Sequence, residues 1–434
     1  MRAAGVGIIQ IVQQLKLAPT RVKRALLTSQ VYQTKSFSAT PQCYISKIQN
    51  EEKVFSENEM IHVVNENGNY MKYPWLWLRD NCQCKTCFNP QMQSRTIDWK
   101  YFDTSVHPKS YSRSNDLVNI TWSDEHESQY SLKWLQEREF VPATQKKWLT
   151  QVYRLTQVPW NAANFSQVLK RFQYCNLIES DEKLLQWLES LAVFGIAIIE
   201  GTPSREDQLQ KLANRVGFIK QTHYGEEFVV RNKPDTTNLA YLAVPLQMHT
   251  DMPYYDYKPG VNMLHCMEQT TEGGENQFVD CLYLSQLLKE TQPDIYKTLS
   301  TVPVDWSDIG EEKKDAFHTL YRAPVICEDK LGQFARVNYN QWQRDSHFNV
   351  PLEDVISWYK ANAIFTKALY DQKNMVQLKT RPGEIVTFDN IRLVHGRSGY
   401  SDSANNERYI IGSYLDWDIV HSRIRILKKE ITRS

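Results

Sequence analysis

The sequence predicts a mainly β protein with flanking helices, in which a double-stranded β-helix (jelly roll) domain follows a small β-rich N-terminal domain. Two observations support this fold class. Short apolar runs recur along the second half of the chain between irregular loops, and the region before them is rich in aromatic residues with short alternating runs. Many short strands joined by irregular loops are typical of a double-sheet barrel with helices on its outside.

Length and composition limit the classes of function. With 434 residues, 41% of them hydrophobic, the chain can bury a large core and suits one large domain plus a smaller one. No run approaches about twenty clean apolar residues, so we expect no membrane span. The net charge of +1 provides no overall electrostatic reason to bind nucleic acid. We therefore expect a small-molecule partner.

Residues 1–40 differ in charge from the rest of the chain. They contain six Lys or Arg residues and no Asp or Glu, and an apolar face lies between Ile8 and Leu15. Such a leader predicts a mitochondrial transit peptide and a matrix location. A disordered basic tail is the alternative. A secretory signal fits less well, because Gln and Lys residues between Gln10 and Lys16 interrupt the apolar run.

Residues 43–145 form the predicted small domain. They are dense in Trp, Tyr, Asn and Lys, and Leu117–Trp122 alternates as a strand does. The polar, mixed segment near residues 146–165 marks the domain junction. We expect the larger domain over residues 160–434.

Helices and strands are both expected in the larger domain. Leu184, Leu188 and Leu191 mark one apolar helix face, and Ser204 followed by charged residues predicts another helix start. Further helices are expected near 284–298 and 351–370. The strand candidates are Val193–Ile199, Val261–Met267, Gln277–Cys281, Glu384–Phe388 and Tyr409–Tyr414.

One triplet has the residue types of a metal site. His249 and Asp251 are two positions apart, so on an extended strand both side chains point to one face. A non-haem Fe(II) oxygenase needs two His and one carboxylate on one face of an octahedron. A surface His–Asp hydrogen bond is the alternative, because this short motif also occurs by chance.

A later segment offers a third ligand. Residues 381–390 contain a turn and a strand, and His395 follows before a glycine. Arg408 begins another apolar strand, where its guanidinium could bind a carboxylate through two hydrogen bonds.

Together these segments form a pattern: H-T-D at 249–251, P-G-E-x-x-x-F-D-N-x-R-x-x-H-G-R at 382–397, then an arginine before a strand. The pattern resembles the 2-oxoglutarate oxygenases of the taurine-dioxygenase-like superfamily, and more closely its γ-butyrobetaine and trimethyllysine dioxygenase branch. The resemblance covers nearly all of the chain after the leader. It implies that His249, Asp251 and His395 hold Fe(II).

The resemblance also implies the cofactor chemistry. Iron would bind the C1 carboxylate and 2-oxo group of 2-oxoglutarate, Arg408 would bind its C5 carboxylate, and Leu264 would lie near it. O₂ would take the remaining position, and the reaction would release succinate and CO₂ while hydroxylating the substrate. Ascorbate is the expected reductant.

Three thiols, Cys82, Cys84 and Cys87, lie within six residues, close enough to bind one tetrahedral zinc. The resemblance adds His126 as the fourth ligand, which would close a structural Cys₃His site. Unligated reduced thiols are the alternative. The spacing of the remaining cysteines suggests no disulfide pairs, so we expect them to be buried or free thiols: Cys43, Cys175, Cys266, Cys281 and Cys327.

The resemblance implies a quaternary ammonium substrate, which aromatic faces recognise. The residues matching the trimethylammonium cage are Tyr224, Phe228, Tyr241 and Tyr414, and those matching the carboxylate-binding positions are Asn238 and Asn340. Phe228 stands where the family usually has Trp. For each of these residues alone, core packing or loop capping is the alternative.

We therefore expect hydroxylation of γ-butyrobetaine to carnitine. The first alternative is trimethyllysine dioxygenation, whose enzyme should prefer an acidic residue at Asn238. The leader is typical of the trimethyllysine enzyme, which is mitochondrial. The butyrobetaine enzyme is usually cytosolic, so a cytoplasmic location is the alternative. An inactive, zinc-organised interaction protein and a protein hydroxylase are further alternatives. Dimerisation is implied by the resemblance alone.

Overall fold

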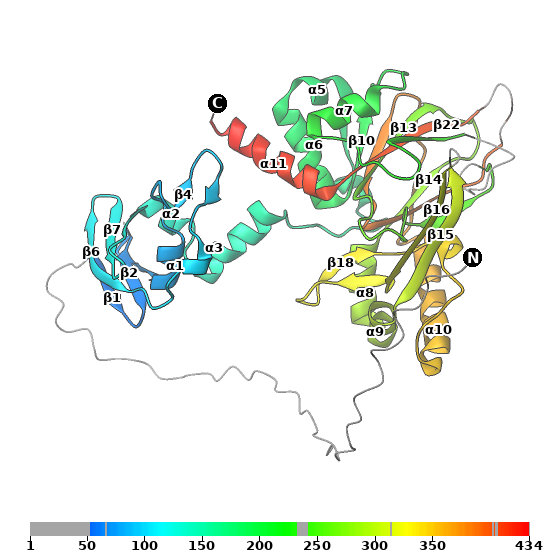
Figure 1. The fold of residues 1–434 in the computed structure, drawn as a ribbon. Helices are drawn as coiled ribbons and strands as arrows, with labels where there is room; N and C mark the ends of the chain where they lie inside the picture. The colour runs from blue at the N-terminus through cyan, green and yellow to red at the C-terminus, as the bar shows by residue number, and fades with distance from the viewer. Residues whose placement is uncertain are drawn as a thin grey trace, which may run out of the picture.

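The computed structural model describes residues 53–65, 67–231, 242–312, 315–401, 403 and 407–433. The expected leader, residues 1–40, lies outside these ranges, as do Asn238, Tyr241 and Cys43. Within them, the chain is mainly β with helices, as predicted (Figure 1). None of the described helices is both long and apolar enough to cross a membrane.

The N-terminal part contains two three-stranded antiparallel sheets around one core. Their strands are β1 (Val54–Glu57), β2 (Met60–Val64) and β3 (Tyr70–Pro74), then β6 (Pro108–Ser114), β7 (Leu117–Trp122) and β8 (Glu127–Ser131). The strand predicted at 117–122 is confirmed, and its alternate residues Val118, Ile120 and Trp122 are buried. The Trp122 ring nitrogen donates to Ser128 Oγ at 2.8 Å, which satisfies the polar atom that this burial removes from water.

Short elements complete this part of the chain. They are α1 (Trp75–Asp80), β4 (Phe88–Asn89), β5 (Ser94–Arg95), η1 (Trp99–Tyr101) and α2 (Leu132–Gln136). The segment of the predicted junction begins with helical turns: α3 (Pro142–Lys147) continues into the π-helical turn η2 (Trp148–Tyr153). Arg425 of the C-terminal helix α11 (Trp417–Ile431) donates to the carbonyl oxygens of Val152 and Tyr153. These bonds satisfy the carbonyl oxygens at the C-terminal end of η2. The local sequence gives no sign of this tertiary contact.

The larger part contains a six-stranded and a four-stranded sheet (Figure 1). The first has the order β11 (Glu227–Val230), β22 (Tyr409–Leu415), β13 (Val261–Glu268), β20 (Ile385–Asp389), β10 (Ile196–Glu200) and β9 (Lys170–Gln173). The second has the order β12 (Leu246–His249), β21 (Leu393–Arg397), β14 (Asn276–Asp280) and β19 (Val376–Leu378). Neighbouring strands are antiparallel except β9 and β10.

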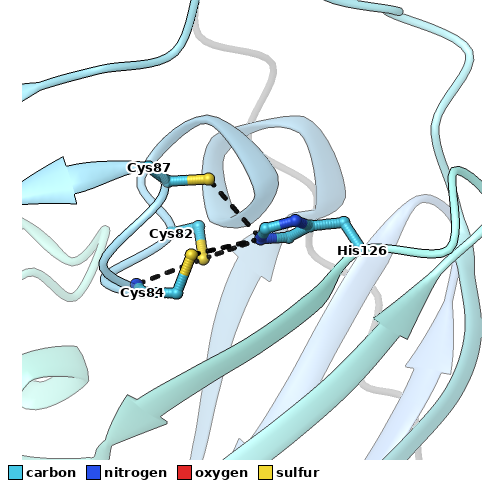
Figure 2. Close-up of side chains that lie close together, drawn as sticks. All are labelled: Cys82, Cys84, Cys87 and His126. Carbon is cyan, nitrogen blue, oxygen red and sulfur yellow. Dashed lines mark hydrogen bonds between the residues drawn. The ribbon is translucent and has the colours of Figure 1, made fainter.

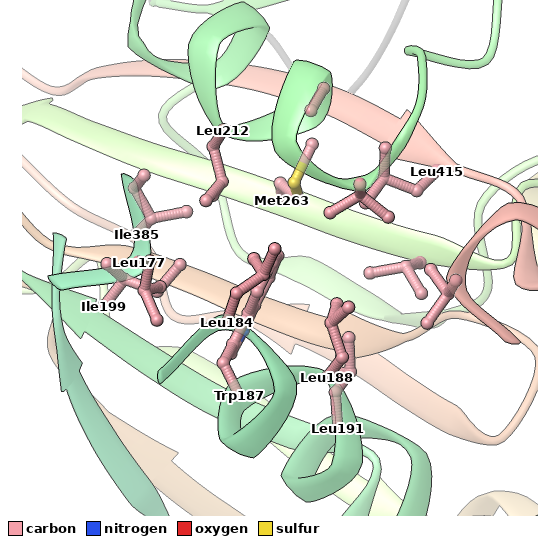
Figure 3. Close-up of a cluster of buried hydrophobic side chains, with 14 of the residues drawn as sticks. Leu177, Leu184, Trp187, Leu188, Leu191, Ile199, Leu212, Met263, Ile385 and Leu415 are labelled. Carbon is pink, nitrogen blue, oxygen red and sulfur yellow. The ribbon is translucent and has the colours of Figure 1, made fainter. Parts of the chain in front are cut away.

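Two cores hold these sheets in place. Phe278 of β14 and Phe388 of β20 meet between the sheets, with ring centroids 5.1 Å apart. On the outer face of the six-stranded sheet, helices α6 (Asp181–Phe194), α7 (Gln208–Val216) and α11 bury leucines and Trp187 against strand residues such as Met263 and Ile385 (Figure 3). The helices leave the other face of this sheet to the inter-sheet core and to the cavity described below.

The remaining elements pack against these two cores or form a third one, which includes Trp306, Trp358 and Phe365. They are α4 (Phe165–Val168), α5 (Tyr174–Glu179), α8 (Cys281–Thr291), α9 (Pro293–Thr301), β15 (Val304–Glu312), β16 (Asp315–Ala323), β17 (Ile326–Glu328), β18 (Phe334–Val337), η4 (Gln341–Gln343) and α10 (Leu352–Leu369). The single helix expected at 284–298 is two helices, because Pro293 begins the second one.

Two further boundaries differ from the sequence predictions. The strand expected from Val193 begins at Ile196, because α6 continues to Phe194 and ends at Gly195, whose φ of 77° suits glycine. The helix expected at Ser204 begins at Gln208, and no side chain caps it. The capping pattern at Ser204 therefore predicted the first residue of this helix wrongly.

Candidate metal centres and active-site cavity

The two candidate histidine ligands come from paired strands. His249 ends β12 and lies directly opposite His395 of β21, with ring centroids 4.2 Å apart. The Nδ1 atom of His249 lies 2.8 Å from the carbonyl oxygen of Gln247. A carbonyl can only accept, so Nδ1 carries the proton and Nε2 is available to a metal.

Asp251 is oriented differently from the sequence prediction, which placed it on one strand with His249. β12 ends at His249, and Met252 has a φ of 52°, so the chain turns immediately after Asp251. The Asp251 N–H donates to Asn390 Oδ1 at 2.8 Å, and the Asn390 amide donates back to the Asp251 carbonyl oxygen at 3.0 Å. Tertiary hydrogen bonds therefore position this residue in place of strand geometry.

One oxygen of the Asp251 carboxylate faces the histidines. Oδ1 lies 3.2 Å from His249 Nε2 and 3.5 Å from His395 Nε2. Oδ2 accepts hydrogen bonds from Asn262 Nδ2 at 2.6 Å and from the Tyr414 hydroxyl at 2.9 Å. The three ligand residues offer donor atoms within 4.8 Å of one another. Two imidazoles and one carboxylate oxygen so close together fit one divalent metal ion.

The protonation states also suit a metal. Burial alone would raise the pKa of the Asp251 carboxyl, but the adjacent imidazoles of His395 and His249 and the Tyr414 hydroxyl lower it to about 2. Burial lowers the pKa of His395 to about 3. Asp251 is therefore a carboxylate and His395 a neutral imidazole near neutral pH, which are the forms that bind a cation.

A cavity of about 310 Å³ is lined by these three ligands and by Arg408 and Leu264. Arg408 is 4% exposed, and its Nε has no hydrogen-bond partner within the described part of the chain. A buried guanidinium facing a cavity needs an anionic partner. Leu264 lies two positions after Asn262 on β13, so both side chains face the cavity.

The residues assigned to the substrate fall into two groups. Tyr224, Phe228, Tyr414 and Asn340 line the same cavity. The Phe228 ring stacks on Tyr414 with centroids 5.1 Å apart, and it covers Gly412, where a Cβ would collide with the ring. Asn238 and Tyr241 lie outside the described residues, so their roles stay predictions.

Sequence reasoning missed several residues of this site. Asn262 and Asn390 orient Asp251, the Trp342 ring lies 5.7 Å from the His249 ring, and Tyr254 and Asp308 line the cavity. Asn262 could have been found, because it shares the strand face of Leu264. Asn390 is part of the pattern at 382–397, although no role was assigned to it, and Trp342, Tyr254 and Asp308 come from distant segments without a local signal.

A second cluster lies in the N-terminal part of the chain (Figure 2). Cys82, Cys84 and Cys87 follow α1, and His126 lies in the turn between β7 and β8. His126 Nε2 lies 3.2 Å from the Sγ atom of Cys82 and 3.5 Å from those of Cys84 and Cys87. The edge of a tetrahedron built from zinc–ligand bonds of about 2.0–2.3 Å is about 3.6 Å. The four donors therefore fit one zinc ion.

Comparison with known proteins identifies the family. Residues 152–414 match the profile described as taurine catabolism dioxygenase TauD, TfdA family, and residues 53–136 match the profile of the γ-butyrobetaine hydroxylase-like N-terminal region. The chain belongs to the TauD, TfdA family of dioxygenases. The resemblance predicted from the sequence is confirmed.

Individual relatives cover most of this dioxygenase. It is 34% identical to human γ-butyrobetaine dioxygenase, across 83% of this chain and 92% of the relative. Identity is 28% to the mitochondrial trimethyllysine dioxygenase of Mus musculus, across 83% of this chain and 84% of the relative. The γ-butyrobetaine dioxygenase of Pseudomonas sp. (strain AK-1) is 27% identical, across 85% and 94% respectively.

Proposed function

We propose that this dioxygenase hydroxylates γ-butyrobetaine at C3 to form carnitine, using Fe(II), O₂ and 2-oxoglutarate and releasing succinate and CO₂. The observation that carries the proposal is that one cavity is lined by the His249, Asp251 and His395 ligands, by Arg408, and by a group of aromatic rings. A metal, an anionic co-substrate and a cationic substrate each find a complementary group there. The higher identity to the human γ-butyrobetaine enzyme favours this substrate over trimethyllysine.

In the proposed reaction, the residues of this chain bind and orient the reactants. Iron bound by the three ligands would supply the activation of O₂. Arg408 would hold the distal carboxylate of 2-oxoglutarate, and Leu264 would pack beside it. Tyr224, Phe228 and Tyr414 would enclose the trimethylammonium group and exclude water, while Asn340 would donate to the substrate carboxylate.

The Asn340 side chain already forms two hydrogen bonds with neighbouring residues of its own loop. Its Oδ1 accepts from the Trp342 N–H at 3.1 Å, and its Nδ2 donates to Gln343 Oε1 at 2.7 Å. An amide nitrogen carries two protons, so one remains for a substrate carboxylate. These bonds would hold the amide in position before the substrate arrives.

We further propose that the two sheets form a double-stranded β-helix and that the Cys₃His cluster binds a structural zinc ion. All four zinc positions would be filled by protein, which leaves none for a reacting water. The domains would span residues 43–145 and 160–434. Residues 1–40 would direct the chain to mitochondria, ascorbate would keep the iron reduced, and the protein would form a homodimer.

The test is a product assay on the chain without residues 1–40. The protein is loaded anaerobically with Fe(II), and γ-butyrobetaine or trimethyllysine is added with 2-oxoglutarate, ascorbate and O₂. We expect γ-butyrobetaine to gain one oxygen atom with stoichiometric succinate, as measured by mass spectrometry and NMR. Reaction with trimethyllysine alone would replace the proposed substrate. Absence of both reactions, with iron binding unaffected by His249→Ala, would overturn the oxygenase assignment.

A further inference from the structure

The hairpin of β15 and β16 brings a second carboxylate to the active-site cavity. Asp308 lies on β15 and lines the cavity together with Phe317 of the paired strand. Its side chain is 21% exposed, so it is largely withdrawn from solvent. A charged carboxylate in such a position needs hydrogen bonds or a positive charge nearby, because burial disfavours the charged form.

The protein supplies Asp308 with a side-chain hydrogen bond but with no full positive charge. Gln343 Nε2 donates to Oδ2 at 3.3 Å. The nearest ionisable nitrogen is His223 Nε2 at 4.0 Å, and burial lowers the pKa of His223 to about 4, so this ring is neutral near pH 7. No lysine or arginine forms an ion pair with Asp308 within the described part of the chain.

Asp308 adjoins the aromatic group of the cavity. The His223 ring lies between Tyr224 and Phe317, at centroid distances of 4.0 and 4.3 Å. Oδ2 of Asp308 lies 4.0 Å from Nε2 of that ring. The carboxylate is therefore separated by a single imidazole from Tyr224, one of the rings assigned to the trimethylammonium group.

Aromatic rings alone discriminate weakly between a cation and a neutral group of the same shape. A trimethylammonium group and a tert-butyl group both bury methyl surface against rings, so part of their binding is shared and only the attraction to the ring faces separates them. A nearby carboxylate interacts with the cation alone, and its attraction is strengthened where water is excluded. A quaternary ammonium group has no N–H, so it attracts the carboxylate through charge rather than through a hydrogen bond.

We propose that Asp308 is the counter-charge that makes this cavity select a cationic substrate over a neutral one of equal shape. This inference rests on the proposed function, because it takes the aromatic end of the cavity as the ammonium site. Asp308 is a specificity-determining residue that binds the substrate and exchanges no atoms with it.

The test compares γ-butyrobetaine with its neutral isostere 5,5-dimethylhexanoate, in which carbon replaces the quaternary nitrogen. Binding of each to the anaerobic Fe(II)–2-oxoglutarate enzyme is measured by calorimetry, and turnover of γ-butyrobetaine is measured in parallel. We expect the wild-type enzyme to prefer the cation by more than tenfold. Asp308→Asn, which keeps the size and an oxygen acceptor, should reduce that preference by about tenfold or more while binding of the isostere changes less than twofold.

Two further variants make the result specific. Asp308→Glu should restore part of the preference, because it restores the charge. Glu290→Gln, at an exposed position of α8 outside the cavity, removes an equal charge where water screens it and should change the preference less than twofold.

The possible failures are distinguishable. If Asp308→Asn keeps the wild-type preference, or weakens both ligands equally, the inference is wrong while the proposed function stands. If the wild-type enzyme neither binds nor oxidises γ-butyrobetaine, the proposed function fails and the inference fails with it.

Discussion

At the scale of single residues, the Asp251 carboxylate shows how neighbouring polar side chains prepare a metal ligand. Asn262 and Tyr414 both donate to Oδ2, which leaves Oδ1 facing the two histidines. Partners of this kind orient a metal ligand and restrict the angles at which it can bind. Tyr414 has a second role in the site, because its ring also stacks on the ring of Phe228.

Removing the Asn262 amide should therefore weaken the metal site. We expect Asn262→Ala to reduce Fe(II) affinity by about 10–100-fold, because Asp251 loses its 2.6 Å hydrogen bond and gains rotational freedom. Anaerobic Fe(II) titration measures the effect. Asn176→Ala, at an exposed position, is the control, and unchanged iron affinity in Asn262→Ala would contradict this role.

Arg408 provides a second test at this scale. Arg408→Lys keeps the charge but loses the planar pair of N–H donors, so we expect the KM for 2-oxoglutarate to rise by about tenfold or more, with little change in the KM for γ-butyrobetaine. Steady-state kinetics with each reactant varied in turn measure both constants. The exposed Arg205→Lys is the control. Equal increases in both KM values would indicate general disruption of the cavity.

At the scale of secondary structure elements, strand pairing brings the site residues together. The β12–β21 register places His249 opposite His395, and the β11–β22 register places Phe228 over Gly412. The pairing register decides on which face of the sheet each side chain lies, because a shift of one residue would turn each of them to the opposite face. The zinc cluster is organised differently, by a loop after α1 and a turn between β7 and β8.

The N-terminal sheets should depend on zinc. Their three thiols and one imidazole converge where no disulfide forms, and metal binding contributes directly to the folding of such modules. We expect Cys87→Ser or chelation to release about one zinc ion per chain and to lower the midpoint of thermal unfolding of this module, as followed by metal analysis and tryptophan fluorescence.

The exposed Cys175→Ser serves as the matched control for this experiment. Fe(II) affinity should stay within about twofold of wild type, because the iron ligands belong to other sheets. Retention of the full folded signal after zinc loss would contradict the structural role.

At the scale of the whole molecule, a buried ion pair joins distant segments. Arg392 bonds both oxygens of Asp280, and the same guanidinium donates to the carbonyl oxygens of Val158 and Val193. Asp280 also accepts from the Trp160 N–H. The pair is at most 1% exposed and connects the segment after η2 with β14, α6 and the turn between β20 and β21. A buried pair of this kind is tolerated because its charges are matched and further hydrogen bonds offset the loss of water.

His265 makes the stability of the whole fold depend on pH. It is fully buried on β13, and neither ring nitrogen has a hydrogen-bond partner among the described residues. Burial lowers its pKa to about 4, below the value of about 6.5 expected in the unfolded chain. The unfolded chain therefore binds the proton more tightly, and stability present above pH 6.5 is lost as the pH falls towards 4.

We expect this residue to lower the free energy of unfolding by about 2 kcal/mol between pH 7.5 and pH 5. Chemical denaturation at both values measures it, and His265→Leu should lose less stability over this range than wild type. His347→Gln, whose side chain is 81% exposed in the parent, should behave as wild type. An identical pH response in His265→Leu would show that other groups cause the whole effect.

The sequence by itself determined the family, the mainly β composition, and the segments that contain the metal-ligating residues, because each has a local signal. The H-T-D triplet, the clustered thiols and the apolar strand runs all depend on residues that are near neighbours in the chain. For the same reason the strands at 117–122 and 261–268 were found with small or no boundary errors.

Only the tertiary structure decided how those residues are oriented. Asp251 is positioned by Asn390, 139 residues away, instead of by a shared strand with His249. The start of α7 was also mispredicted, because packing outweighs weak local preferences. Asp308 reaches the cavity through the folding of a distant hairpin. Hydrogen bonds and burial across long sequence separations leave no periodic pattern, so only the folded chain reveals them.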